Sequence, residues 1–298
     1  MDTGDLPIVI TVSPASSRDT ATAPHITIVA GATPAPNPID TTAFLVAQHY
    51  RDFLGREPDA EGFAFWQNEI NSCGQDTQCL EVKRINVSAA FFLSIEFQQS
   101  GYLVYRAYRA AYGNMPGAPV PLTRAQFLPD TRQIANGVIV NQGNWQQQLE
   151  ANKQAYFADF VTRQRFLEAY PMVWTAEQFV DRLYENAGMA SMSAPNRAAA
   201  INEIESAPPS DNAARARALR LVAEDAMLTQ REFNPAFVLM EYFGYLQRNP
   251  PDSPELTLDY QGYNFWLAKL NQFNGDYNKA EMVKAFLSSI EYRQRFAQ

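Results

Sequence analysis

From Asp40 onward, apolar residues recur at the three- and four-residue spacing of amphipathic helices. The first stripe has its apolar side chains at positions i, i+4, i+7 and i+8, namely Val46, Tyr50, Phe53 and Leu54. Gly55 follows directly, and a glycine after the last periodic residue is a common helix stop. The same stripe returns at residues 104–112, 179–187 and 238–246. The pattern therefore predicts four helices of one kind, spread evenly along the chain.

A longer motif follows the first and the last of these helices. An Arg-x-Pro breaker is followed by a loop, and a Gly-aromatic-x-Phe-Trp sequence then opens the next helix. The motif residues are Arg56, Pro58, Gly62 and Trp66 in the first copy, and Arg248, Pro250, Gly262 and Trp266 in the second. The two helices opened in this way are predicted to end at Asn71 and Asn271. This repetition indicates a duplicated architecture.

A second recurring element, interpreted as an amphipathic helix end, closes each stretch. Residues 91–97 match residues 286–292 closely and place Glu96 and Glu291 at equivalent positions, whereas residues 160–166 and 227–233 match more loosely. We therefore divide the chain into four tandem helical units: residues 41–101, 102–171, 172–234 and 235–298. One unit cannot bury both faces of its helices alone, so the predicted fold is all-α, with the units stacked into one continuous core. As domains, we expect residues 41–171 to hold units one and two, and residues 172–298 to hold units three and four.

The two inner units depart from the motif. Unit two carries a Pro- and Gly-rich insertion at residues 114–121 and then a stretch at residues 127–143 that we expect to be irregular, before Trp145 resumes the helix. In unit three an Ala- and Arg-rich helix is predicted over residues 213–222, with Ser210 or Asp211 as its N-cap.

Residues 1–40 have a different pattern, with two short β-branched runs separated by Ser, Thr, Ala and Pro. The apolar positions of these runs are Ile8, Ile10, Val12, Ile26 and Ile28. Two strands alone do not make a stable sheet. Residues 1–40 are therefore expected to be a β-rich arm that pairs with another surface, the tail of a preceding β-domain, or a linker, and the sequence leaves these alternatives open.

Composition narrows the function classes. The chain has 298 residues, is 46% hydrophobic and has a formal net charge of -8. An acidic chain without basic runs argues against nucleic-acid or anionic-membrane partners. No apolar run approaches the ~20 residues of a membrane helix. The first residues lack the features of a signal peptide, so an exported protein would need a leader ahead of this numbering.

The two cysteines, Cys73 and Cys79, lie in one short polar segment. A zinc site would need two further ligands, and the two histidines, His25 and His49, show no ligand spacing with the cysteines. We favour a short disulfide between helices, which implies an oxidising compartment. The alternative is a pair of reduced thiols in a cytosolic loop.

Charged residues in the motif are interpreted as structural. Arg56 with Glu96, and Arg248 with Glu291, are expected to form an ion pair or helix-end cap within each outer unit. The loops that follow the two arginines carry carboxylates at Asp59, Glu61, Asp252, Glu255 and Asp259. We expect helix capping from them, with a Ca²⁺ site as a minor alternative because the EF-hand spacing is missing.

Aromatic residues are abundant, with 14 Tyr, 19 Phe and 4 Trp. Most fall on helical stripes and are predicted to pack in the core. Trp145 and Trp174 lie outside the motif and are the preferred candidates for an exposed, sugar-stacking platform. The chain has no Gly-rich phosphate loop, Gly-x-Ser-x-Gly, His-Glu-x-x-His or Cys-x-x-Cys sequence, so we predict no enzymatic activity and no cofactor.

The order of these signals, from Tyr50 through Arg56, Pro58 and Trp66 to the Ser-Ile-Glu sequence at 94–96, resembles the bacterial DUF4214 family. That family is distantly similar to the helical linker domain of phycobilisomes. The resemblance is best at residues 41–101 and 235–298. It implies an extracellular or cell-surface helical module without established catalysis.

The expected function is that of a secreted or surface-attached bacterial scaffold. Its partners are expected to be proteins, either other copies of the chain or another surface protein. Self-assembly through the arm would give a filament or layer. The alternative is a glycan-binding or adhesion module that uses exposed aromatic side chains, and an enzyme is the least favoured reading.

Overall fold

All regular secondary structure in the described part of the chain is helical. The computed structural model describes residues 36–190, 194, 196–208, 211–255 and 257–297, and no β-strand occurs within these ranges. The all-α prediction is thus confirmed for this part. The arm positions lie outside the described residues, namely Ile8, Ile10, Val12, Ile26 and Ile28.

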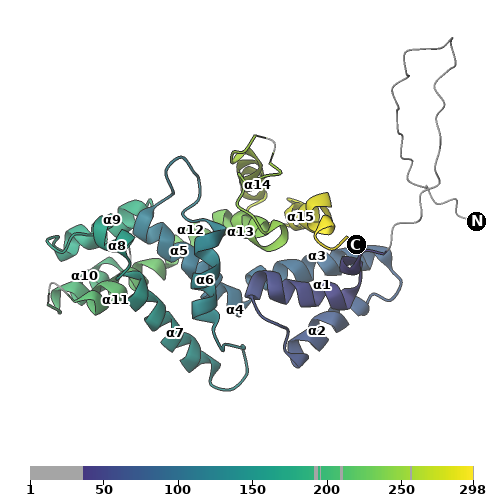
Figure 1. Ribbon diagram of the computed structural model, residues 1–298, viewed down its shortest axis with the longest axis horizontal. Coiled ribbons are helices and arrows are strands. Elements are labelled where there is room, and N and C mark those ends of the chain that lie inside the picture. Colours follow the sequence, from purple (N-terminus) through teal and green to yellow (C-terminus); the bar gives the residue numbers. More distant parts are fainter. Residues whose placement is uncertain (1–35, 191–193, 195, 209–210, 256, 298) are drawn as a thin grey trace, which may run out of the picture.

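The chain passes through a long series of mostly short helices (Figure 1). In order these are η1 Pro38–Asp40, α1 Thr42–His49, η2 Tyr50–Leu54, α2 Ala60–Asn71, α3 Thr77–Leu93, α4 Ile95–Gln99, α5 Gly101–Tyr112, α6 Arg124–Ala135, α7 Trp145–Phe160, α8 Gln164–Ala169, α9 Ala176–Asn186, α10 Arg197–Glu205, α11 Asn212–Ala223, α12 Ala226–Arg231, α13 Phe233–Glu241, η4 Tyr242–Leu246, α14 Gln261–Gln272, α15 Met282–Ser288 and α16 Ile290–Gln294.

The first predicted stripe lies on α1 and on η2, which continues α1 as a π-helical turn. All four of its apolar side chains are buried. Gly55 ends the turn at φ 67°, in the left-handed region that favours glycine. The last stripe repeats this arrangement on α13 and η4, where Gln247 takes the left-handed position at φ 58°. A helix that ends in a π-helical turn is therefore present twice.

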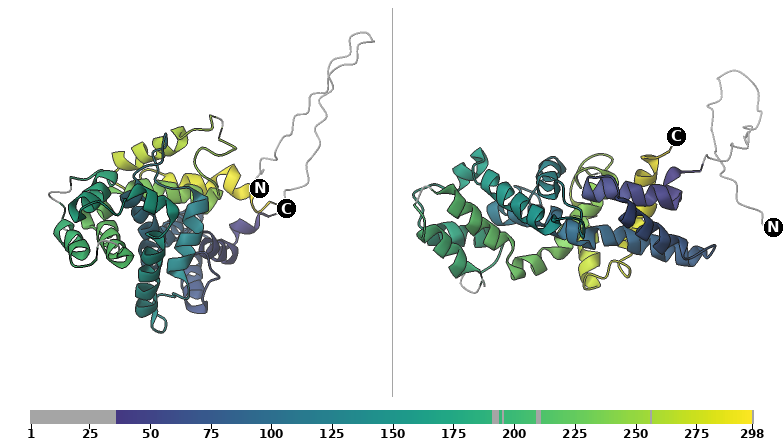
Figure 2. Two further views of the ribbon diagram at one scale, coloured as in Figure 1. Left: turned by 60° about the vertical axis from the view of Figure 1, so that its left-hand side comes forward. Right: turned by 90° about the horizontal axis from the view of Figure 1, so that it is seen from below.

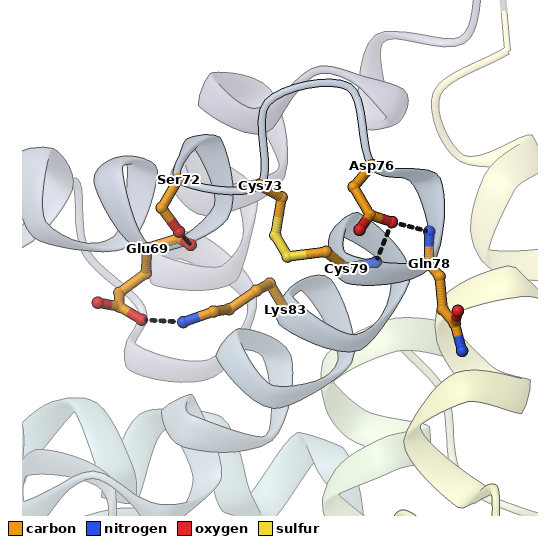
Figure 3. The surroundings of a disulfide bond; sticks show 7 residues. All are labelled: Glu69, Ser72, Cys73, Asp76, Gln78, Cys79 and Lys83. Carbon is orange, nitrogen blue, oxygen red and sulfur yellow. Dashed lines mark hydrogen bonds and ion pairs between the residues drawn. A yellow bond between two sulfur atoms is a disulfide. The ribbon is translucent and has the colours of Figure 1, made fainter.

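A disulfide joins the end of α2 to the start of α3 (Figure 3). The Cα atoms of Cys73 and Cys79 are 5.5 Å apart, and this is the predicted pair. Between them, the Asp76 carboxylate accepts hydrogen bonds from two backbone N–H groups in the first turn of α3, each at 3.0 Å. Glu69 of α2 and Lys83 of α3 form an ion pair at 2.7 Å on the same side. The two helices are thus tied at one end by covalent and charged contacts.

The second recurring element is a helix break and not the simple helix end that the sequence suggested. α3 stops at Leu93, and the Ser94 hydroxyl accepts a hydrogen bond from the Phe97 N–H at 3.1 Å to start the short helix α4. Ser289 caps α16 in the same way, at 3.1 Å from the Tyr292 nitrogen. Serine favours such N-cap positions because its side chain replaces the missing intrahelical partner.

The stretch at residues 127–143 is only partly irregular, which corrects the prediction. α6 covers Arg124–Ala135, begins with a reciprocal capping box between Thr123 and Gln126, and contains Pro129. A helix forms there although proline inside a helix normally disfavours it. The Ala- and Arg-rich helix is α11, whose first turn is capped by Asp211, which accepts from the Ala213 N–H at 2.8 Å.

The helices pack in two groups that do not follow chain order. The buried helix α5 packs against α9 and α11, whereas η2 packs against η4 and α3 packs against α15. Figures 1 and 2 show the group around α5 at one end of the molecule and the group around α1 and α3 at the other. One hydrophobic cluster connects both groups, with members from Ile39 to Tyr292. Unit one therefore packs against unit four, and unit two packs against unit three.

The residues just before α1 are anchored to the far end of the chain. Ile39 is fully buried, Asn37 donates a side-chain hydrogen bond to the Arg293 carbonyl at 2.9 Å, and Asp40 pairs with the Arg293 guanidinium at 2.7 Å. Arg84 of α3 donates to the backbone carbonyls of Ile39 and Asp40 at 2.7 and 3.0 Å. The helical body thus begins at Asn37, inside the segment assigned to the arm.

Candidate functional site

The motif arginine of unit one is held in a bidentate ion pair. Arg56 Nε and Nη2 donate to the two carboxylate oxygens of Glu96 at 2.7 and 2.8 Å. Its third nitrogen, Nη1, donates to Asp59 at 3.2 Å, and the guanidinium lies 4.8 Å from the centre of the Tyr50 ring. The loop after η2, the start of α2 and the start of α4 are thereby joined through one side chain.

Unit four contains the same arrangement. Arg248 Nε and Nη2 donate to Glu291 at 2.6 and 3.1 Å, and the guanidinium lies 5.4 Å from the Tyr242 ring centre. Glu255 is the second carboxylate, at 3.5 Å. Each outer unit therefore holds one arginine between two carboxylates and a tyrosine ring.

The motif glycine is required by that tyrosine. A Cβ added at Gly62 would overlap the Tyr50 hydroxyl, and one added at Gly262 would lie 2.7 Å from the Tyr242 hydroxyl. No other residue type lets the second helix approach the tyrosine this closely. The sequence showed the glycine twice, and the structure supplies its reason.

An apolar cleft borders the ion pair of unit one. Phe65, Trp66 and Ile95 line it, together with Val140 from the loop between α6 and α7. The cleft has a volume of about 350 Å³. Trp66 packs against the buried ring of Phe91 at 5.9 Å, whereas the Phe65 ring meets only the edge of Trp66, at 4.8 Å, and is mostly exposed. The cleft therefore offers apolar side chains to solvent beside a fixed charge cluster.

The equivalent surface of unit four has the same apolar side chains. The Phe265 ring lies 5.0 Å from Trp266, which packs at 5.7 Å against the buried Phe286, and Phe265 itself is exposed. Ile290 is the counterpart of Ile95 and is exposed as well. We call the two surfaces the unit-one groove (Phe65, Trp66, Ile95) and the unit-four patch (Phe265, Trp266, Ile290). Figure 1 shows α2 and α14, which carry their aromatic residues, on opposite edges of the molecule.

The pKa values of Tyr50 and Asp59 at the unit-one groove are both shifted away from neutral pH. Burial and the nearby Asp59 charge raise the pKa of Tyr50 to about 12. Burial also acts to raise the pKa of Asp59, but the hydrogen bond from Gly62 and the Arg56 charge outweigh it, so the pKa of Asp59 is lowered. Neither group exchanges a proton near pH 7. The cluster is built to position side chains and to present a fixed charge.

Most of the loop carboxylates accept hydrogen bonds from nearby backbone N–H groups and side chains. Asp59 accepts from the Gly62 N–H at 2.8 Å, Asp252 accepts from the Asn249 N–H at 3.0 Å, and Asp259 accepts from the Gln261 N–H at 2.8 Å. Glu61 is exposed beside the unit-one groove. Within the described ranges, no group of three or more His, Cys, Asp or Glu side chains could hold a metal ion.

The most exposed aromatic rings are not the predicted ones. Trp145 and Trp174 are half-buried against the core, whereas Phe65 and Phe265 inside the motif are exposed. A signal for this was present in the sequence. Consecutive residues of an α-helix point about 100° apart, so the adjacent Phe and Trp of the motif cannot both face the core.

A serine and a histidine also meet, but deep in the core. His49 Nδ1 donates to the Leu45 carbonyl at 2.7 Å, which leaves Nε2 to accept from the Ser88 hydroxyl at 2.6 Å. Burial lowers the pKa of His49 to about 4. Both side chains are almost fully inaccessible, so this pair is a buried structural contact between α1 and α3.

No helix in the described part of the chain is both long and apolar enough to cross a bilayer. No family model, curated protein or solved structure matches the chain.

Proposed function

We propose that the protein is a non-catalytic scaffold, secreted or attached to the bacterial cell surface, that assembles with other copies of itself. Its body consists of four tandem helical units, and the β-rich arm at residues 1–35 links one copy to the next. The observation that carries this proposal is the pair of equivalent exposed apolar surfaces, the unit-one groove and the unit-four patch. Their aromatic residues are carried by α2 and α14, which Figure 1 shows on opposite edges of the molecule.

Exposed apolar side chains that cluster are a common feature of protein-binding surfaces. Both surfaces combine them with an ion pair whose hydrogen bonds are already made, so a partner gains apolar contact without having to desolvate an unpaired charge. Such a surface offers apolar side chains to the arm of another copy, so each copy can contact one neighbour through its arm and a second neighbour through its body. Contacts of this kind generate an open chain unless the rotation between copies closes a ring.

The unit division is supported by features that occur in both outer units. These are the π-helical turn, the arginine with two carboxylates, the glycine under a tyrosine hydroxyl and the serine at the helix break. The resemblance to the DUF4214 family supports the surface location, and so does the disulfide, because disulfides persist mainly in oxidising compartments.

The test is the mass of the purified protein, measured by light scattering and viewed by electron microscopy, with and without residues 1–35. We expect assemblies far above the 33.5 kDa of one chain for the full protein and a folded monomer after the truncation. The truncation stops before Asn37 because Ile39 belongs to the core. A monomer in both forms contradicts the proposal, and so does an assembly that survives the truncation.

A second candidate function is glycan binding, which is favoured by the exposed Phe65 and Phe265 rings beside Trp66 and Trp266. Sugar stacking on these rings should change tryptophan fluorescence. Titration with bacterial surface polysaccharides separates this function from self-assembly, because the response should be independent of residues 1–35.

A further inference from the structure

The unit-one groove is completed by a loop that lies outside the duplicated motif. Val140, Asn141 and Gln142, from the loop between α6 and α7, line the same cleft as Phe65 and Ile95. Asn141 has a backbone φ of 70°, in the left-handed region that asparagine tolerates better than most residues. The cleft therefore combines the apolar side chains of the motif with a turn that the motif does not supply.

Three polar side chains that line the cleft have hydrogen-bonding capacity to spare. Glu61 and Asn141 are exposed, and neither side chain takes part in a hydrogen bond or ion pair within the described part of the chain. Gln142 makes one side-chain hydrogen bond, from Nε2 to Asp59, and its length of 3.4 Å is beyond the usual range. Two amides and one carboxylate are thus available to a ligand, as donors and as acceptors.

The charges in the cleft disfavour an anionic ligand. One arginine stands against the carboxylates of Asp59, Glu61 and Glu96. All three nitrogens of Arg56 already donate to acceptors of the protein. A phosphate, a sulfate or an acidic sugar would therefore meet the Glu61 charge without a free cation to offset it.

A cationic ligand would gain little more. Asp59 and Glu96 accept hydrogen bonds from Arg56, so among the described carboxylates of the cleft only Glu61 is without a partner. Glu61 is exposed, and an ion pair formed with it would be weak because water screens it. The groove therefore favours a neutral ligand that forms hydrogen bonds through several groups.

The aromatic lining and the size of the cleft suit a sugar ring. The Phe65 side chain is 56% exposed and can pack against the C–H groups on one face of a pyranose. The hydroxyls at the edge of such a ring need donors and acceptors around the aromatic side chain. The cleft volume of about 350 Å³ is at the lower end of small-molecule sites, which span about 300–1,000 Å³. The cleft therefore has room for a short saccharide.

We propose that the unit-one groove binds a neutral pyranose, whose ring face packs on Phe65. The sugar hydroxyls exchange hydrogen bonds with Glu61, Asn141 and Gln142. This inference rests on glycan binding, the second candidate function, and adds the site, the class of sugar and the residues that select it. The sugar can be free or part of a polysaccharide, since both present the same ring and hydroxyls.

The unit-four patch provides a comparison within the same molecule. It repeats the exposed phenylalanine, as Phe265, but residues 141 and 142 belong to unit two and are not duplicated with the motif. Loss of the Phe265 ring should therefore leave sugar binding unchanged.

The experiment measures saturation transfer by NMR from the full chain to methyl glycosides of glucose, galactose, mannose and N-acetylglucosamine. Each sugar is in large excess, and glucuronic acid is the acidic counterpart. The sugar with the strongest signal is then titrated against two groove variants, Phe65→Ser and Asn141→Gly/Gln142→Ala. Glycine is used at position 141 because it keeps the left-handed conformation there.

Two matched controls remove similar groups elsewhere. Phe265→Ser removes the equivalent ring of the unit-four patch, and Gln146→Ala/Gln147→Ala removes two exposed amides from the neighbouring helix α7. Circular dichroism verifies that each variant is folded, and if one groove variant fails to fold, the other still decides.

We expect a neutral sugar to bind and glucuronic acid to bind more weakly. Each groove variant should lose about tenfold in affinity, and both controls should keep the wild-type affinity. Oligomers of the same sugar that bind more tightly than the single ring would identify a polysaccharide as the source, and equal affinities would identify the free sugar.

Three results overturn the inference. Sugar binding that is lost in Phe265→Ser but kept in both groove variants removes the site and leaves glycan binding standing. Saturation transfer to none of the neutral sugars removes the site and the second candidate function together. A preference for glucuronic acid contradicts the charge argument. Self-assembly is measured separately by light scattering, so its failure would not be mistaken for a failure of sugar binding.

Discussion

Replacement of Glu96 by glutamine tests whether the motif ion pair holds unit one together. Glu96 has a side chain only 6% exposed and accepts hydrogen bonds from Nε and Nη2 of Arg56. Breaking a buried pair costs about 3–5 kcal/mol when the remaining charge has no other partner. Here Asp59 stays within 3.2 Å of Arg56, and the glutamine oxygen still accepts one hydrogen bond. We therefore expect a loss of about 2 kcal/mol in the free energy of unfolding.

The duplicated motif supplies its own comparison. Glu291 makes the same pair with Arg248, but its side chain is 28% exposed, so water compensates more of the loss. Glu291→Gln should cost about 1 kcal/mol. Glu185→Gln serves as a control because its ion pair with Arg182 is exposed, and pairs of that kind contribute about 0.5 kcal/mol or less.

Urea unfolding followed by tryptophan fluorescence and circular dichroism gives the three values, with the slope m checked for constancy. The order Glu96, Glu291, Glu185 is the result that follows from burial. Equal losses at Glu96 and Glu185, or a larger loss at Glu291 than at Glu96, would refute the reasoning. Loss of a specific activity without loss of stability would instead assign Glu96 a chemical role.

Three further perturbations have defined outcomes. Burial lowers the pKa of His49 from 6.5 to about 4, so the unfolded chain binds a proton at a higher pH than the folded chain does. The free energy of unfolding should therefore have its full value above pH 6.5 and decline by about 3 kcal/mol toward pH 4. His49→Gln should flatten this slope in unfolding curves. Gly244→Ala should lower the melting temperature because the new Cβ overlaps the Phe53 ring where η4 meets η2. This loss should exceed the gain from the higher helix propensity of alanine. An unchanged melting temperature would show that the contact adapts. Reduction with dithiothreitol, or Cys73→Ser/Cys79→Ser, should cost about 2 kcal/mol for a closed loop this short, and identical urea midpoints before and after reduction would contradict it.

Helical class and local stops could be predicted from the sequence because they depend on neighbours within one or two turns. Gly55 and the stripe before it are examples, since periodicity and a residue that tolerates positive φ decide both. α6 was not predicted, although the capping box at its start is a local signal. The cap satisfies two backbone donors, and this local gain is visible only when Thr123 and Gln126 are considered together.

The residues of the ion pairs could be predicted from the sequence, but the exposure of the apolar side chains beside them could not. The Arg-Glu pairing follows from two motif elements that recur together, whereas the exposure of Phe65 and Ile95 depends on which helix faces which. The hydrophobic pattern of the sequence also did not predict that unit one packs against unit four. Gly244 carries that contact, yet in the sequence it is one glycine within an apolar helix.

The packing of the first unit against the last has a consequence for how the chain folds. Contacts such as that between Asn37 and Arg293 join residues 256 positions apart, so they can form only after nearly the whole body has been synthesised. The helices around α5 meet partners that are much nearer in sequence. Because long loops slow the formation of contacts, α5, α9 and α11 should become protected from hydrogen exchange before α1 and α3 in a refolding experiment. During synthesis Phe53 lacks its contacts with Gly244 and Tyr245 until both residues have been made, and apolar side chains left uncovered in this way favour aggregation of the nascent chain.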